Sequence, residues 1–183
     1  MLELKDFEAA YNKVQEVVLP TKLIKSDYFS DQTGNDVYLK PENMQLTGAY
    51  KIRGAYYKIS TLSEEEKAKG LITASAGNHA QGVALAAARQ GVKATIVMPT
   101  TTPLLKVNRT KDLGAEVILH GDVYDEACEY AMKLAKEQGL LVGTSSGANV
   151  FAAMQMAEKY GKDKVIATVL ADRAERYFST GLI

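Results

Sequence analysis

The sequence predicts an α/β fold with an open, mainly parallel sheet and helices on both of its faces. Short runs rich in β-forming residues alternate with helix-patterned stretches along the chain, as in right-handed βαβ units. Apolar residues make up 46% of the 183 residues and charged residues 24%, a composition that can build a core. Hydroxyl, amide and glycine residues follow two of the predicted strands, which is where open α/β sheets bind their ligands.

The predicted elements begin with an amphipathic N-terminal helix that has Leu4, Phe7, Tyr11 and Val14 on one face. Strands are expected where β-branched and aliphatic residues cluster, at residues 37–40, 71–75, 93–99, 115–121, 140–145 and 164–171. Helical patterns lie between them, near residues 49–59, 78–90, 103–113, 122–138 and 147–160. Asp122 is the predicted N-cap of the fourth of these helices.

Charge and composition narrow the class of partner. The 22 basic and 22 acidic residues cancel, so we expect no nucleic-acid or membrane partner and favour a small neutral or zwitterionic ligand. The single cysteine, Cys128, cannot form an internal disulfide, and with two histidines it is too little for a metal cluster. Because no signal-peptide core or bilayer-length apolar run is found, we expect the protein in the cytoplasm.

Lys51 stands between Tyr50 and Ile52 at the expected start of a helix. A lysine on a solvated helix face is ordinary, whereas a lysine in an apolar setting loses its proton more readily and becomes a nucleophilic amine. The residues alone leave both interpretations open. Arg53 faces away from Lys51 on such a helix, so we expect it in a surface salt bridge rather than on a ligand.

Two loops at the ends of predicted strands combine hydroxyl, amide and glycine residues before a helix N-terminus, at residues 75–82 and 144–149. Free N–H groups at such a terminus favour an anion, although Ser75, Ser145 and Ser146 could equally be N-caps. His79 is a candidate general base. A position in the first turn of a helix lowers the pKa of a histidine, and a structural role for His79 is at least as compatible with the pattern.

Three segments carry a family resemblance: "NMQLTGAYKIRGAYYKI", "ASAGNHAQGVALAA" and "ATIVMPTTTPLLKVNRTKDLGAEVILHG". Over residues 1–139 the chain resembles the threonine dehydratase branch of the fold-type II pyridoxal-phosphate enzymes. The resemblance implies that Lys51 carries pyridoxal 5'-phosphate as a Schiff base and that Asn78 binds the hydroxyl of the cofactor ring. It also places Ser75, Gly77 and His79 near the substrate carboxylate.

Residues 140–183 instead resemble the C-terminal end of cysteine synthase, in which the residue matching Ser145 faces the pyridine nitrogen of the cofactor. The resemblance implies a shortened fold: residues 1–47 from the large domain, residues 48–139 as the small βα domain, and residues 140–183 as a C-terminal remnant. The central part of the family fold, with its glycine-rich phosphate loop, is expected to be missing. None of the 14 glycines in the sequence is adjacent to another.

Three functions are compatible with this interpretation. The first is β-elimination on L-threonine or L-serine, which yields a 2-oxo acid and ammonia. The second is β-replacement as in cysteine synthase, and the third is a folded remnant without catalysis that binds a partner or a small anion. Racemisation is disfavoured, because Ala76 stands where the resembling serine racemase carries a second hydroxyl. A small amino acid is the expected substrate, and a homo-oligomer the expected assembly.

Overall fold

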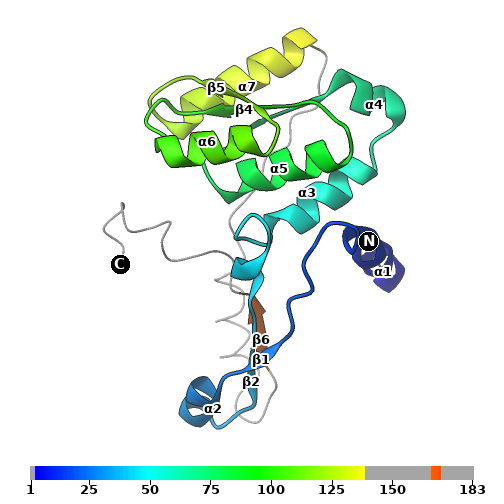
Figure 1. The fold of residues 1–183 in the computed structure, drawn as a ribbon, viewed down its shortest axis with the longest axis vertical. Coiled ribbons are helices and arrows are strands. Elements are labelled where there is room, and N and C mark those ends of the chain that lie inside the picture. Colours follow the sequence, from blue (N-terminus) through cyan, green and yellow to red (C-terminus); the bar gives the residue numbers. More distant parts are fainter. Residues whose placement is uncertain (1–2, 139–165, 170–183) are drawn as a thin grey trace.

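The computed structural model describes residues 3–138 and 166–169 of the chain (Figure 1). The helices are α1 (Leu4–Val14), α2 (Asp27–Thr33), α3 (Lys51–Ser60), α4 (Glu64–Lys69), α5 (Asn78–Arg89), α6 (Leu104–Asp112), α7 (Tyr124–Gln138) and the short 3-10 helix η1 (Glu42–Met44). The strands are β1 (Ile24–Lys25), β2 (Val37–Lys40), β3 (Leu71–Ala74), β4 (Ala94–Met98), β5 (Glu116–Leu119) and β6 (Ile166–Val169).

The α/β fold expected from the sequence is confirmed in this part of the chain. Strands β2 to β6 and helices α1, α3, α5, α6 and α7 lie within a few residues of their predicted positions. The predicted strand 140–145 and helix 147–160 lie outside the described residues. Strand β1 and helices α2 and α4 were not predicted.

The strands in the described part of the chain form two sheets of three. Strands β3, β4 and β5 are all parallel, with Ala74 opposite Val97 and Val97 opposite Ile118. In the other sheet β1 is antiparallel to β2, and β2 is parallel to β6. Figure 1 shows β2 and η1 leading from this second sheet to the start of α3. The domain boundaries expected from the sequence stay a prediction.

The core lies on both faces of the β3–β4–β5 sheet. On one face Ile72, Ala74 and Val97 pack with residues of α7. On the other face Ile96 and Met98 pack with residues of α3, α5 and α6. Successive strand residues point to opposite faces, so this alternation places Thr73 on the α5 side of the sheet. Covering both faces with helices is what a parallel sheet requires.

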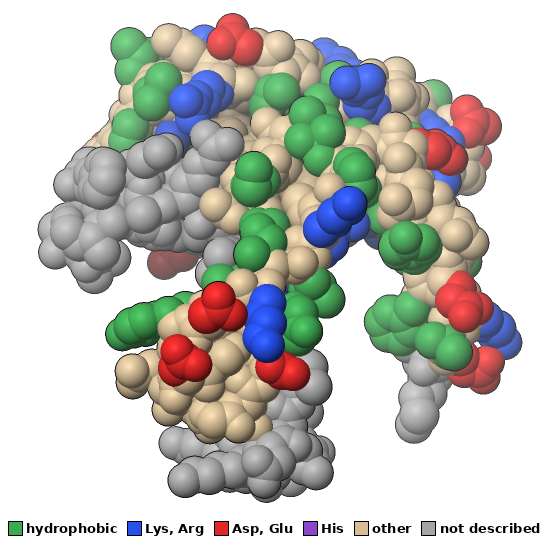
Figure 2. Space-filling view, turned by 60° about the horizontal axis from the view of Figure 1, so that its bottom comes forward, with side chains coloured by type: hydrophobic (Ala, Val, Ile, Leu, Met, Phe, Trp, Pro, Cys, Tyr) green, Lys and Arg blue, Asp and Glu red, His purple; other side chains and the backbone are tan. Residues whose placement is uncertain are grey.

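Helix α1 packs only by its C-terminal end. Val14 is buried, whereas the exposed fractions of Leu4, Phe7 and Tyr11 are 73%, 59% and 63%. The apolar face expected from the sequence is therefore mostly open to solvent, and Figure 2 shows hydrophobic side chains on the α1 arm at the right of the view.

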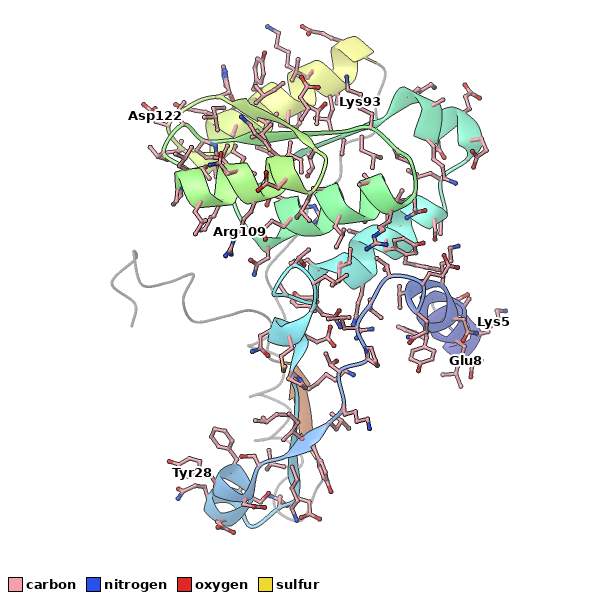
Figure 3. All side chains as sticks on the ribbon, in the orientation of Figure 1. Lys5, Glu8, Tyr28, Lys93, Arg109 and Asp122 are labelled. Carbon is pink, nitrogen blue, oxygen red and sulfur yellow. The ribbon has the colours of Figure 1, made fainter. Side chains whose placement is uncertain are left out.

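The predicted N-cap role of Asp122 is wrong. Helix α7 begins at Tyr124, and the Ala127 N–H donates to the Val123 carbonyl 3.3 Å away. The Asp122 carboxylate instead accepts a hydrogen bond from Thr100 Oγ1 at 2.8 Å, so it ties the loop after β5 to the loop after β4. Figure 3 shows Asp122 at this end of the sheet.

Candidate active site

Lys51 is the first residue of α3 and is half-buried. Its Nζ lies 5.3 Å from the centroid of the Tyr50 ring, within the range of a cation–π contact. The next residue, Ile52, is completely buried. Lys51 therefore occupies an intermediate setting, neither on a fully solvated face nor inside the core.

Helix α5 crosses α3 closely at Lys51. A Cβ atom added to Gly82 would lie 3.0 Å from the Lys51 carbonyl carbon and 3.1 Å from the Lys51 Cβ. Only a residue without a side chain allows this approach unstrained. Sequence reasoning did not single out Gly82, although an isolated glycine inside a helical pattern is a known sign of close packing.

Ser75 shapes the turn between β3 and α5. Its N–H donates to the Val97 carbonyl at 3.0 Å, which continues the β3–β4 pairing. Its Oγ accepts hydrogen bonds from the N–H groups of Gly77, at 3.3 Å, and Ala80, at 3.2 Å. Ser75 is therefore not the N-cap of α5, but its Oγ fixes the turn into that helix, and its predicted role at the substrate carboxylate stays a prediction. The hydroxyl hydrogen of Ser75 is not used in these two bonds.

The N-terminus of α5 brings Gly77, Asn78 and His79 to the carboxyl end of β3. Gly77 is the N-cap, and a Cβ atom added to it would meet no described atom within 4 Å. Asn78 is the first residue of the helix, and His79, the second, is half-buried. Among the described residues, space is therefore left beside Gly77, where the sequence predicts a ligand.

His79 and Lys51 are close enough to interact electrostatically. Burial lowers the pKa of His79 below its ordinary value of 6.5, and the positive charge of Lys51 lowers it further. The direction agrees with the sequence-based expectation, but the physical causes are burial and Lys51. The charge of Lys51 thus acts on a residue 28 positions further along the chain, in the helix whose Gly82 packs against the Lys51 backbone.

Arg53 is not in a surface salt bridge, contrary to the expectation from the sequence. Its Nε and Nη2 donate to the two carboxylate oxygens of Glu42, each at 2.7 Å. Glu42 is only 2% exposed. Burial raises the pKa of Glu42, but hydrogen bonds from Arg53 and Thr21 outweigh burial, so the net pKa lies below 4.5. Sequence reasoning missed Glu42.

The predicted roles of Ser145 and Ser146 stay predictions. Ser145, the predicted partner of the pyridine nitrogen, lies outside the described residues, as does Ser146. Among the described residues, no group of three or more histidine, cysteine, aspartate or glutamate side chains could hold a metal ion. No described helix combines the length and apolar character needed to span a bilayer.

Comparisons with known proteins give the site a family context. Residues 14–140 match the family described as "Pyridoxal-phosphate dependent enzyme". The L-threonine ammonia-lyase of Thermotoga maritima is 52% identical over 139 residues, which is 76% of this chain and 35% of that protein. The processed form of threonine deaminase isoform 2 from Solanum lycopersicum is 40% identical with a TM-score of 0.70, over 78% of this chain and 41% of that one.

A structure of maize serine racemase is also similar, with 27% identity and a TM-score of 0.73 over 86% of this chain and 50% of that one. The chain thus spans between about a third and a half of the length of these relatives.

Proposed function

Because the chain belongs to the pyridoxal-phosphate-dependent enzyme family, we propose that Lys51 and the Ser75–His79 turn are the amino-acid-handling part of a lyase site. The proposed reaction is the deamination of L-threonine or L-serine to a 2-oxo acid and ammonia. The observation that carries the proposal is the meeting of two helix N-termini at Lys51. Gly82 brings α5 against the Lys51 backbone, and His79 lies within range of the Lys51 charge.

These residues fit one end of pyridoxal phosphate. Lys51 offers a primary amine at the start of α3, and the space beside Gly77 lies at the start of α5. Lys51 would hold the cofactor covalently, and Asn78 would bind its ring hydroxyl. Pyridoxal phosphate, when bound, supplies an electron sink that stabilises negative charge at the Cα atom of an amino acid.

Lys51 also has an acid-base role in the proposed reaction. With cofactor and substrate bound, the Lys51 Nζ would be the base that takes the proton from the substrate Cα. The same Nζ would return that proton to the β-hydroxyl, which would leave as water, and hydrolysis of the remaining product with a second water would give the 2-oxo acid and ammonia. One side chain thus attaches the cofactor and moves the proton.

The α5 N-terminus is the proposed site of the substrate carboxylate. The twelve-residue helix carries partial positive charge at this end. The Ser75 hydroxyl can donate its hydrogen there, and the small Gly77 leaves room for the ligand. With its pKa below 6.5, His79 is a neutral imidazole at pH 7 and acts as a hydrogen-bond group rather than a cation.

Beside deamination, β-replacement and a non-catalytic role remain alternatives, whereas racemisation is disfavoured. A racemase needs an acid or base on the second face of the substrate, and Ala76 has no group that could act as one. A non-catalytic role is favoured by the glycine pattern, because no two of the 14 glycines adjoin and no consecutive-glycine loop can cradle the cofactor phosphate. We therefore expect the cofactor to be held mainly through Lys51, unless another helix N-terminus binds its phosphate.

The proposal is tested with the 183-residue chain at high pyridoxal phosphate concentration. We expect a shifted cofactor absorption band and formation of 2-oxobutyrate from L-threonine. Both should be lost in Lys51→Ala and kept in Lys58→Ala, a matched control because Lys58 is an exposed lysine two turns further along the same helix. Equal signals in the two variants would refute the proposed role of Lys51.

A further inference from the structure

We propose that Glu42 is a positioning residue for Lys51, acting through a two-bond ion pair with Arg53 that anchors the first turn of α3. This inference rests on the proposed role of Lys51. Neither Glu42 nor Arg53 need touch the substrate or the cofactor, because their effect on the site passes through the backbone of α3.

The ion pair between Glu42 and Arg53 fixes the first turn of α3. Both carboxylate oxygens of Glu42 are used, Oε2 by Arg53 Nε and Oε1 by Arg53 Nη2, each at 2.7 Å. A planar guanidinium bound at two points has a fixed orientation as well as a fixed distance. Because Lys51 and Arg53 are the first and third residues of α3, fixing Arg53 also fixes the turn that begins with Lys51.

Helix α3 lacks the local devices that normally stabilise a helix start. Among its own described residues it has no acidic side chain in the first turn, and its N-cap, Tyr50, makes no side-chain capping bond. The first turn instead carries two cations, Lys51 and Arg53, at the end where the helix dipole disfavours positive charge. Glu42 supplies the missing negative charge from outside the helix.

Helix α4 shows what a self-sufficient helix start looks like in the same chain. Its N-cap Ser63 and Glu66 form a capping box, and its first turn holds three glutamates. The N-terminus of α4 therefore has its own cap and its own negative charge. The contrast indicates that α3 depends on a tertiary contact, and the carboxylate of Glu42 provides it.

Glu42 also has partners other than Arg53. Thr21 Oγ1 donates to Glu42 Oε1 at 2.6 Å, and Lys40 Nζ lies 4.0 Å from the same oxygen. Lys40 Nζ also donates to the Thr21 carbonyl oxygen. Thr21, Glu42 and Arg53, which are distant in sequence, therefore meet at one buried carboxylate. Such an arrangement can fix the position of α3 as well as neutralise a charge.

Further along the same turn, Gln45 bonds both the N–H and the carbonyl of Leu19, each at 2.9 Å. The segment around residues 19–21 is thereby fixed to the turn that carries Glu42. If Glu42 moved away from α3, its bonds to Arg53 and Thr21 and the Gln45 bonds to Leu19 would be lost together, so the position of the carboxylate is fixed by several contacts at once.

The test uses the pKa of His79 as a reporter of where Lys51 lies, measured by NMR titration without added cofactor. The sequence has only two histidines, so a His120→Gln background identifies the His79 signal. Arg53→Lys is the main variant, because it keeps every charge and removes the two-point fork. Glu42→Gln removes the anion, and Val107→Ala, a core change in α6, is the control for general loss of stability.

We expect the pKa of His79 to rise toward its ordinary value in Arg53→Lys and in Glu42→Gln, because Lys51 moves away from it. Loss of the Glu42 charge alone would change the pKa in the opposite direction, so a rise reports movement. The rate of Lys51 modification by pyridoxal phosphate and borohydride should fall by about ten- to a hundredfold in both variants. Val107→Ala should change neither.

An unchanged His79 pKa in folded Arg53→Lys would overturn the inference, as would the same shift in Val107→Ala. If Glu42→Gln does not fold, Arg53→Lys decides the question alone. Absence of Lys51 modification in the unaltered chain would count against the proposed function instead, because the His79 titration involves no cofactor.

Discussion

Replacing Gly82 by alanine tests whether the close crossing of α3 and α5 holds Lys51 in place. The added Cβ would lie 3.0 Å from the Lys51 carbonyl carbon, 3.1 Å from the Lys51 Cβ and 3.2 Å from the Ile52 nitrogen. Ordinary contact begins at 3.4 Å, so the shortest approach is about 0.4 Å too close (3.4 less 3.0). Two of the three contacts are with backbone atoms, which cannot rotate away.

The expected free-energy change combines two opposing effects. Overpacking of this kind costs about 1–3 kcal/mol. Alanine in place of glycine inside a helix gains about 1 kcal/mol through helix propensity. We therefore expect Gly82→Ala to lower the free energy of unfolding by about 0–2 kcal/mol, with α3 displaced at Lys51.

Urea denaturation of Gly82→Ala and of Gly54→Ala provides the assay. Gly54 is an exposed glycine within α3, and a Cβ atom added there would meet no described atom within 4 Å. Gly54→Ala should therefore gain about 1 kcal/mol in the free energy of unfolding. An equal gain in Gly82→Ala, with unchanged modification of Lys51, would refute the close-packing argument.

Three further predictions concern charge, a buried hydroxyl and cofactor retention. In urea titrations the unaltered chain should lose stability as the pH falls below about 4.5, because the folded-state pKa of Glu42 is lowered. Glu42→Gln should be about 3–5 kcal/mol less stable at pH 7, and its free energy of unfolding should depend less on pH in the acid range. Thr73→Val should be neutral or raise the free energy of unfolding by up to about 1 kcal/mol, because within the described part of the chain the buried Thr73 Oγ1 has no hydrogen-bond partner; a clear loss would reveal an unrecognised partner. Equilibrium dialysis should find weak retention of pyridoxal phosphate, since losing three charge-assisted phosphate bonds weakens binding by about 4.5–9 kcal/mol, or about three to six decades; tight retention would show that another segment holds the phosphate.

The elements that the sequence predicts well are the long and strongly patterned ones. Strands β3 and β4 are runs of apolar and β-branched residues buried on both faces, and periodicity finds them directly. The two-residue strand β1 is too short for any periodic pattern. Helix α4 carries a local signal in its Ser63 and Glu66 capping box, but this signal is not one of apolar periodicity, so α4 was not predicted.

The candidate site divides in the same way between local and tertiary information. Local patterns draw attention to Lys51, a lysine at a helix start, and to the Ser75–His79 turn, a polar turn after a strand, but their expected roles come from the family resemblance. The Glu42 to Arg53 ion pair depends on burial of Glu42 beneath α3, which no local pattern indicates. Gly82 is likewise visible as a glycine in the sequence, but its approach to Lys51 follows only from the crossing of two helices.

The most direct test of the proposed function is to locate the lysine that reacts with pyridoxal phosphate. The 183-residue chain is incubated with the cofactor, reduced with borohydride, digested and mapped by mass spectrometry. The proposed site predicts that modification is concentrated at Lys51 in the unaltered chain. In Lys51→Ala it predicts no modification of helix α3. Modification spread over exposed lysines such as Lys58, or concentrated at Lys40, would contradict it.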